Sequence, residues 1–342
     1  MKKPAVLKEG DRVAIVSPST SLPSIFPAVA DRGIENLRKY FGLVPVIAEH
    51  AYSDIEHNYL HPEMRARDLN EAYGDRSIKA IISTIGGDES VRILRYLDAA
   101  TISENPKIFT GFSDCTTVTS YLFNRNIASI YGGAVMAGFA QMEHFPKEFR
   151  DYWYRIMFED SRNLRMEGFH EFSEGYPDWR SSTEASAISK KQHAEEWKWI
   201  NGDSMKGRIF AANLEVLDSL RGTDHFPLKE YLKGHMLLLE TSEEVPKPLQ
   251  VARTIRNFAV TGILDTVTGI GLGRYRGYSG DMKMEVRARI ADVLRKEFGL
   301  EDLPFVDGLD FGHTDPYFPL PVGTKAHIEG NSITFLESFA TP

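Results

Sequence analysis

Lys107-Ile-Phe-Thr-Gly-Phe-Ser-Asp-Cys-Thr-Thr-Val-Thr-Ser-Tyr121 is the stretch around which the chain is organised. Its short apolar run at residues 108–109 predicts a buried strand, and the helical spacing of apolar residues over 118–122 predicts a helix after it. Between the two lies a tight turn at residues 111–114. A serine in such a turn exposes its hydroxyl at the edge of a sheet, and the N–H groups of the helix N-terminus favour an anion beside it.

This strand–turn–helix pattern is typical of a nucleophile elbow with Ser113 as the nucleophile. The usual pattern Gly-x-Ser-x-Gly is incomplete, because Cys115 occupies the place of the second glycine. A helix cap made by Ser113 or Asp114 is the alternative that the pattern leaves open.

The composition is that of a soluble globular protein with more than one domain. The chain has 342 residues, of which 42% are hydrophobic and 26% charged. Its formal net charge of −8 argues against nucleic acid or an anionic membrane as a partner. No apolar run reaches the ~18 residues of a membrane span, and the N-terminal residues lack the pattern of a signal peptide. A single cysteine excludes an internal disulfide and is typical of a reducing compartment, so we expect a cytoplasmic protein.

The first 150 residues alternate predicted strands with predicted helices. Buried strands are expected at residues 13–16, 44–48, 78–85, 108–109 and 127–131, with helices that include 28–41 and 64–72 between them. Such alternation predicts an α/β domain whose mostly parallel sheet is covered by helices on both faces. Ligands of these sheets bind at the carboxyl ends of the strands, where Gly86-Gly87 and Ser113 both lie.

Beyond residue 150 the pattern changes twice. Residues 151–205 mix aromatic and charged side chains without a steady period, which predicts a linker or loop that covers a site or simply connects two domains. Residues 206–342 predict a smaller mixed domain with much β structure, and residues 326–335 alternate like antiparallel strands.

A nucleophilic serine needs a base, and the base needs a third group that orients it. Among ten histidines, His313 is distinctive because it lies in a turn between Gly312 and Asp315-Pro316 that fixes its backbone. Glu240 ends a buried strand, so its carboxylate requires a partner. By spacing alone, a satisfied buried glutamate and an ordinary turn histidine would explain the same pattern.

Seven stretches taken in order carry more information than any one of them. They are Gly10-Asp-Arg-Val-Ala-Ile-Val-Ser-Pro-Ser19, Arg65-Ala-Arg-Asp-Leu-Asn70, Lys79-Ala-Ile-Ile-Ser-Thr-Ile-Gly-Gly87, Asn105-Pro-Lys-Ile-Phe-Thr-Gly-Phe-Ser-Asp114, Gly207-Arg-Ile-Phe-Ala-Ala-Asn-Leu214, Leu239-Glu-Thr-Ser-Glu-Glu244 and Phe311-Gly-His-Thr-Asp-Pro316. In this order and at these separations they resemble the LD-carboxypeptidase family of serine peptidases, which includes the microcin C immunity protein.

The resemblance implies a triad of Ser113 as nucleophile, His313 as base and Glu240 as the group that orients the base. It also implies an oxyanion hole made of the N–H groups of Gly87 and Asp114.

The same resemblance implies an N-terminal flavodoxin-like α/β domain that carries the serine and a C-terminal β-rich domain that carries the other two residues. The site would then form between the domains. Family members are often cytoplasmic homodimers and need no metal or cofactor.

Two residues beside this site are expected to contact the substrate. Gly86 precedes the oxyanion hole, and Asn213 matches a family position near the substrate; an asparagine that caps the following helix is the alternative.

The sequence departs from the family pattern at two places. Asp88-Glu89-Ser90 follows Gly87 where a neutral residue is usual, which puts negative charge beside the oxyanion hole. Ala211-Ala212 replaces a glycine pair before Asn213, so two methyl groups narrow the approach of a ligand.

We expect a serine-type hydrolase that cleaves an amide bond near a free carboxylate, such as the L,D-peptide bond of cell-wall muropeptides. An immunity-type hydrolase of aminoacyl–nucleotide conjugates is the alternative, and Trp179, with Trp197 and Trp199, would then stack on an aromatic part of the substrate. Packing between domain and linker would equally explain these tryptophans. A binding protein that has lost activity is a third interpretation, against which the presence of all three triad residues argues.

Overall fold

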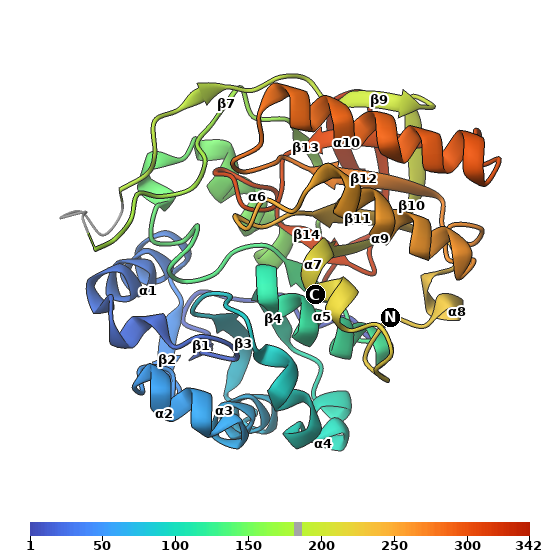
Figure 1. The fold of residues 1–342 in the computed structure, drawn as a ribbon. Coiled ribbons are helices and arrows are strands. Elements are labelled where there is room, and N and C mark those ends of the chain that lie inside the picture. Colours follow the sequence, from blue (N-terminus) through green and yellow to red (C-terminus); the bar gives the residue numbers. More distant parts are fainter. Residues whose placement is uncertain (181–186) are drawn as a thin grey trace.

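Two β-sheets with helices around them form the computed structural model, which describes residues 1–180 and 187–342 (Figure 1). The first sheet is mostly parallel and carries helices on both faces, and the second is a larger mixed sheet. The predicted fold class, an α/β part followed by an α+β part rich in strands, is confirmed.

The first sheet has the strand order β14-β5-β4-β3-β1-β2. Its strands are β1 (Arg12–Val16), β2 (Val44–Ile47), β3 (Ile78–Ser83), β4 (Ile108–Gly111), β5 (Ser129–Tyr131) and β14 (Leu320–Val322). Strands β1 to β5 run parallel, and β14 pairs with β5 in the antiparallel direction. The helices of this part are α1 (Pro27–Phe41), α2 (Ile55–Leu60), α3 (Pro62–Gly74), α4 (Ala99–Glu104), α5 (Thr116–Asn124) and α6 (Lys147–Phe158).

Strand β1 shows why this sheet is covered on both faces. Successive side chains of a strand point to opposite faces. Val13 and Ile15 accordingly belong to the same apolar cluster as α1, whereas Ala14 and Val16 belong to the cluster of α3 and α5. Because both faces of β1 are buried, its sequence is a continuous hydrophobic run and does not alternate.

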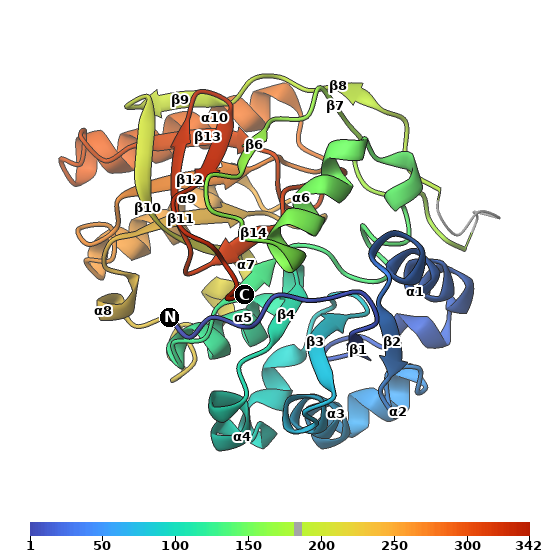
Figure 2. The ribbon, with the colours of Figure 1, turned by 180° about the vertical axis from the view of Figure 1, so that it is seen from behind.

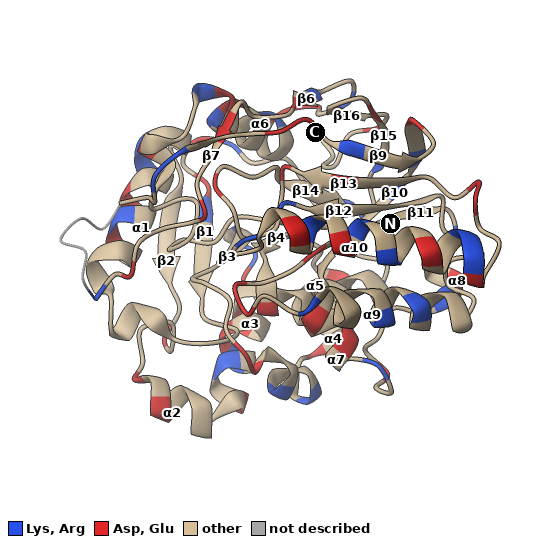
Figure 3. Ribbon diagram, turned by 45° about the horizontal axis from the view of Figure 1, so that its top comes forward, with Lys and Arg blue, Asp and Glu red and all other residues tan. Residues whose placement is uncertain are grey.

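The second sheet has the order β6-β16-β15-β10-β11-β12-β13-β9. Its parallel centre comprises β10 (Ser204–Asn213), β11 (His235–Glu240), β12 (Gly269–Gly273) and β13 (Phe305–Leu309). The antiparallel flanks are β9 (Lys198–Asn201), β15 (Lys325–Glu329), β16 (Ser332–Phe335) and β6 (Arg165–Glu167). The helices are α7 (Leu214–Ser219), α8 (Lys229–Leu232), α9 (Pro248–Val260) and α10 (Gly280–Asp292). Lysine, arginine and acidic residues are interspersed along α10, which lies beside α9 (Figure 3).

Residues 151–205 differ from the expected linker or loop. They hold most of α6, the strands β6 and β9 of the second sheet, and a small pair made of β7 (Glu171–Phe172) and β8 (Gln192–His193). Helix α6 forms because Phe149, Tyr152, Trp153 and Ile156 follow helical spacing and are all buried. The proposed domain boundaries at residues 150 and 205 stay a prediction.

The two parts of the chain are joined by apolar packing and by strand β14, a late segment that pairs with the first sheet. The rings of Phe123 on α5 and Phe210 on β10 lie 4.9 Å apart, and β14 adds a late segment to the first sheet. The two termini lie side by side, since Thr341 exchanges backbone hydrogen bonds of 2.8 Å with Pro4 and Val6 (Figure 2). The carboxyl ends of β4 and β11 therefore face a common region between the sheets.

Candidate active site

The turn after β4 holds Ser113 in an unusual backbone conformation. Its φ angle is 57°, a left-handed value that is uncommon for residues other than glycine and is typical of functional sites. A 3₁₀ turn over Ser113–Cys115 then leads into α5. The Ser113 N–H donates a hydrogen bond to Tyr131 Oη at 3.1 Å, which fixes the turn against the neighbouring strand β5.

The loop after β3 approaches this turn closely, and glycine makes the approach possible. A Cβ atom on Gly86 would lie 2.9 Å from the Ser113 Cβ. Gly87 has a φ of 146°, and a Cβ atom there would lie 2.1 Å from Thr20 Oγ1. Gly86 is thus required by the closeness of the Ser113 side chain, and Gly87 by its φ angle and the closeness of Thr20.

Ser113, His313 and Glu240 form one chain of hydrogen bonds. His313 Nε2 lies 3.0 Å from Ser113 Oγ, and His313 Nδ1 lies 2.6 Å from Glu240 Oε2. Glu240 is 1% exposed and His313 is 8% exposed, so water is largely excluded from the contact between them. With Nδ1–H donating to the carboxylate, Nε2 is free to accept the proton of the serine hydroxyl.

Glu240 is held in place by two further donors. Tyr131 Oη donates to Glu240 Oε1 at 2.5 Å, and Asn213 Nδ2 donates to the same oxygen at 3.1 Å. Asn213 is the direct neighbour of Glu240 in the pairing of β10 with β11. Its Oδ1 also accepts the N–H of Val216, so Asn213 caps α7 while it orients the carboxylate. The helix-cap alternative for Asn213 is therefore observed, and the residue also lines the cavity described below.

A second carboxylate lies next to the imidazole. Glu243 Oε2 is 3.3 Å from His313 Nε2, on the same nitrogen that faces Ser113. Burial is the largest single effect and lowers the pKa of His313, but the carboxylates of Glu240, Glu243 and Glu215 together raise it by more. The net result is a pKa above the ordinary value for histidine.

This electrostatic setting predicts the pH dependence of hydrolysis. The base must be neutral to accept the serine proton, so kcat/KM should fall as the pH drops through the pKa of His313, and the midpoint should lie above ~6.5. Glu243→Gln should move this midpoint to lower pH, because it removes one of the anions that stabilise the imidazolium. A pH profile of kcat/KM for wild type and variant checks both statements. A midpoint that is unchanged in Glu243→Gln would contradict the role of this carboxylate.

Ser113 and His313 open into a cavity of about 480 Å³ that both parts of the chain line. Gly86, Gly87 and Asp114 lie on its wall together with Ser113, and their contacts with a substrate stay predictions. The other lining residues are Thr20, Leu22, Ile85, Asp88, Phe112, Tyr176, Asn213, Glu215, Val216, Ser219, Ser242, Glu243 and Glu244. Its volume lies within the roughly 300–1,000 Å³ of small-molecule sites.

The side chain of Asp114 has a structural role. Its carboxylate accepts hydrogen bonds from Ser19 Oγ at 2.5 Å and from the Ser90 N–H at 2.7 Å. These bonds tie the elbow to the loops after β1 and β3, so that only the backbone of Asp114 is available to a substrate oxygen.

The charges after Gly87 have different surroundings. Glu89 forms ion pairs with Arg65 at 3.1 Å and with Arg92 at 2.8 Å. Asp88 lies on the cavity wall. Of the two acidic residues predicted beside the site, Asp88 therefore contributes its charge to the cavity.

The structure does not bring the three tryptophans to the cavity wall. Trp179 is buried behind Tyr176, whose ring is stacked on it at 4.2 Å, and it is Tyr176 that lines the cavity. Trp197 Nε1 donates to Asp310 at 2.6 Å and Trp199 Nε1 donates to the Gly330 carbonyl at 2.9 Å, so both pack in the second sheet. A direct contact of Trp179 with substrate stays a prediction that this placement does not favour.

Four functional candidates were missed in the sequence: Tyr131, Tyr176, Glu215 and Glu243. Tyr131 ends a predicted strand next to the elbow strand, which was the available signal. Glu243 follows Glu240 by three residues, but nothing in the pattern shows that the chain turns back toward His313. Burial, with Glu240 nearby, raises the pKa of the Glu215 carboxyl, and its position follows only from the fold.

Two searches of the described residues bear on other functions. Across residues 1–180 and 187–342, no group of three or more His, Cys, Asp or Glu side chains is placed to hold a metal ion. Within the same residues, every helix is too short or too polar to cross a bilayer.

Comparison with known proteins identifies the family of this chain. The model of the LD-carboxypeptidase N-terminal domain matches residues 13–132, and that of the LD-carboxypeptidase C-terminal domain matches residues 206–328. The chain belongs to the LD-carboxypeptidase family. The two matched regions place Ser113 in the N-terminal family domain, and Glu240 and His313 in the C-terminal one.

Three other proteins are similar to this chain over most of its length. YocD of Bacillus subtilis, whose name assigns it provisionally to the carboxypeptidases, is 29% identical over 96% of both chains. The microcin C7 self-immunity protein MccF of Escherichia coli is 28% identical over 78% of this chain and 75% of its own. An MccF-like protein from Streptococcus pneumoniae, solved in complex with AMP, superposes with a TM-score of 0.82 at 26% identity, covering 95% of this chain and 98% of its own.

Proposed function

We propose that this LD-carboxypeptidase family member is a serine hydrolase of amide bonds, in which Ser113 is the nucleophile, His313 the base and Glu240 the orienting group. The observation that carries the proposal is the unbroken hydrogen-bond chain from Ser113 Oγ through His313 to Glu240 at the mouth of a cavity. A structural serine would not need a left-handed backbone, a buried imidazole and a buried carboxylate in one line.

The geometry supports the following course. His313 Nε2 takes the proton of Ser113 as its oxygen attacks the scissile carbonyl, and the N–H groups of Gly87 and Asp114 receive the developing oxyanion. His313 then gives that proton to the leaving nitrogen, which departs as an amine. Water, activated by the same imidazole, hydrolyses the acyl-serine and restores the site.

The leading substrate class is the L,D-peptide bond of a muropeptide, which the family membership supports. A direct experiment offers the purified protein a tetrapeptide stem and an aminoacyl-adenylate analogue, and identifies the products by mass spectrometry. Release of the terminal D-residue from the stem supports the carboxypeptidase reaction, whereas an intact stem and a free nucleotide product support the second candidate.

The second candidate, hydrolysis of an aminoacyl–nucleotide conjugate, rests on Tyr176. Its ring lies on the cavity wall and is backed by Trp179 in a stacked arrangement. Such a rigid aromatic surface can stack on a nucleobase. The similarity to the AMP-bound protein from Streptococcus pneumoniae supports the same candidate.

The charge of the cavity constrains either substrate. Asp88, Glu215, Glu243 and Glu244 line it, and none of its described lining residues is a lysine or arginine. A carboxylate on the acyl side of the scissile bond would meet like charges there, while an ammonium group would be attracted. Because Glu243 lies 3.3 Å from the base, such an ammonium group would lie close to the scissile bond.

A matched substrate series tests this preference for positive charge. With one leaving group and an acyl residue of lysine, norleucine or glutamate, we expect kcat/KM to decrease in that order. Glu244→Gln should lower the rate with the lysine substrate several-fold and leave the norleucine substrate nearly unchanged. Faster cleavage of the glutamate substrate by wild type would contradict the proposed selectivity without affecting the triad.

A further inference from the structure

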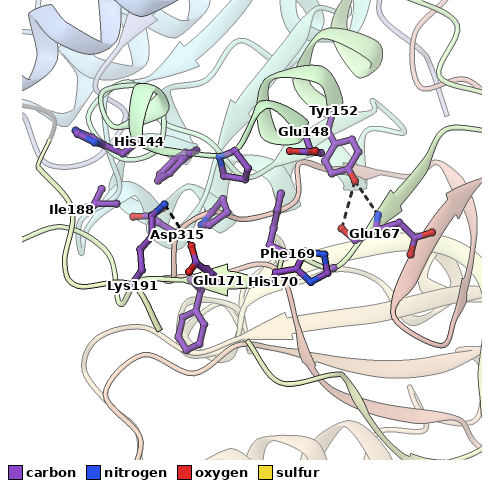
Figure 4. A pocket seen from close by; sticks show the side chains of 15 residues that line it. His144, Glu148, Tyr152, Glu167, Phe169, His170, Glu171, Ile188, Lys191 and Asp315 are labelled. Atoms are coloured by element: carbon purple, nitrogen blue, oxygen red, sulfur yellow. Dashed lines mark hydrogen bonds and ion pairs between the residues drawn. The ribbon is translucent and has the colours of Figure 1, made fainter. Parts of the chain in front are cut away.

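A second cavity, of about 530 Å³, lies apart from Ser113 and is unused by the proposed reaction. Figure 4 shows its labelled side chains, with His144, Ile188, Lys191 and Asp315 toward one end and Tyr152 and Glu167 toward the other. The remaining lining residues are Phe145, Pro146, Glu148, Gly168, Phe169, His170, Glu171, Phe172 and Pro316.

Most of the wall is aromatic or aliphatic. Phe145, Phe169 and Phe172 are buried, and Tyr152 is fixed by its hydroxyl, which accepts the Glu167 N–H at 3.0 Å. Rings fixed in this way offer apolar contact area and electron-rich faces. The body of a ligand in this cavity is therefore apolar or aromatic.

Asp315 supplies one buried polar group on that wall. It is 6% exposed, and within the described part of the chain its carboxyl oxygens accept no hydrogen bond. A carboxyl group without a partner in such a place is costly. Burial raises its pKa to about 7, although Arg276, Arg274 and His313 act in the opposite direction.

Within the described residues Asp315 forms no ion pair, although the charge of Arg276 acts on it from beyond ion-pair distance. The guanidinium of Arg274 is engaged by Asp310, and Lys191 is paired with Glu171 at 3.7 Å. Glu148 is an exposed carboxylate among the lining residues, whereas Glu167 is paired with Arg165. The cavity thus combines an unpaired carboxyl, aromatic walls and the exposed carboxylate of Glu148.

We propose that this cavity is a second ligand site, which takes a small organic cation: a protonated amine on an aromatic or aliphatic body. The ammonium group pairs with Asp315 while the apolar body packs on Phe145, Phe169 and Phe172. Carboxylates and aromatic faces together are a common means of binding organic cations. Because Asp315 follows His313 by two residues, the ligand lies behind the loop that carries the base.

Calorimetry at about pH 8 with phenethylamine and its uncharged counterpart 2-phenylethanol tests the site. Wild type should bind the amine at least about tenfold more tightly, a difference of ~1.4 kcal/mol. Asp315→Asn should bind the two compounds alike, and Glu148→Gln, an exposed carboxylate of the same cavity, should keep the preference nearly intact. Phe145→Leu should weaken amine binding severalfold and provides a second variant should Asp315→Asn not fold.

Three outcomes would overturn the proposal: equal affinity of wild type for both compounds, a preserved preference for the amine in folded Asp315→Asn, or no binding of the amine up to about 10 mM. Since binding alone is measured, the result is independent of whether the triad hydrolyses any substrate.

Discussion

Ser113→Ala should lower the rate of hydrolysis by at least about 10⁴-fold, and His313→Ala should lower it by a similar factor. The serine hydroxyl is almost wholly protonated at neutral pH and becomes a nucleophile only as His313 Nε2, 3.0 Å away, accepts its proton. Because the two groups act in one step, the double variant should be no slower than either single variant. Steady-state kinetics gives all three values, with whichever of the two proposed substrates the wild type cleaves.

Ser219→Ala is the matched control for this comparison. Ser219 lines the same cavity, but its hydroxyl donates to the Val216 carbonyl at 2.7 Å. It takes no part in the hydrogen-bond chain through His313. The control should keep nearly full activity. Losses that multiply in the double variant, or an active Ser113→Ala protein, would show that the two residues do not act together.

Glu240→Gln should also lower the rate of hydrolysis by several orders of magnitude. The variant should still be roughly 10²-fold more active than Ser113→Ala. Tyr131 Oη and Asn213 Nδ2 both donate to one oxygen of Glu240, so a glutamine would keep its carbonyl toward them. Its NH₂ group would then face His313 Nδ1, which would have to accept a hydrogen bond. The imidazole would carry its proton on Nε2, the tautomer that cannot take a proton from Ser113.

A comparison with Glu215→Gln separates this tautomer effect from a general loss of charge. Glu215 lines the same cavity, but its carboxylate accepts hydrogen bonds from the N–H and hydroxyl groups of Ser242 and is not part of the hydrogen-bond chain through His313. We expect a loss of less than about tenfold for Glu215→Gln. Equal, small losses in both variants would contradict the orienting role of Glu240.

Much of the fold could be predicted because it rests on local patterns. Strands such as β1 and β11 are buried along nearly their whole length, so they read as continuous apolar runs. The segment 151–205 shows no single period because its aromatic residues are divided among α6, β7, β9 and the loops between them. The helical spacing of Phe149, Trp153 and Ile156 was present, but the short edge strand β9 has no comparable signal.

The sequence could nominate the residues of the candidate site but not their surroundings. Ser113 and His313 are 200 residues apart, and no spacing rule joins them; the family resemblance supplied that link. The cavity is acidic because the loop after β11 meets the turn at Ser113. Glu243, which lies next to His313, belongs to this loop. Such long-range contacts are set by tertiary packing, so the proposed preference for a cationic substrate could not be inferred from the sequence.

Covalent labelling is the most direct test that Ser113 is the activated nucleophile. A fluorophosphonate reacts with a serine whose proton is taken by a neighbouring base. Intact-protein and peptide mass spectrometry should find one adduct, located on Ser113, which is absent from Ser113→Ala and forms far more slowly on His313→Ala. An adduct on another residue, or an enzyme that hydrolyses its substrate while Ser113 stays unlabelled, would contradict the assignment.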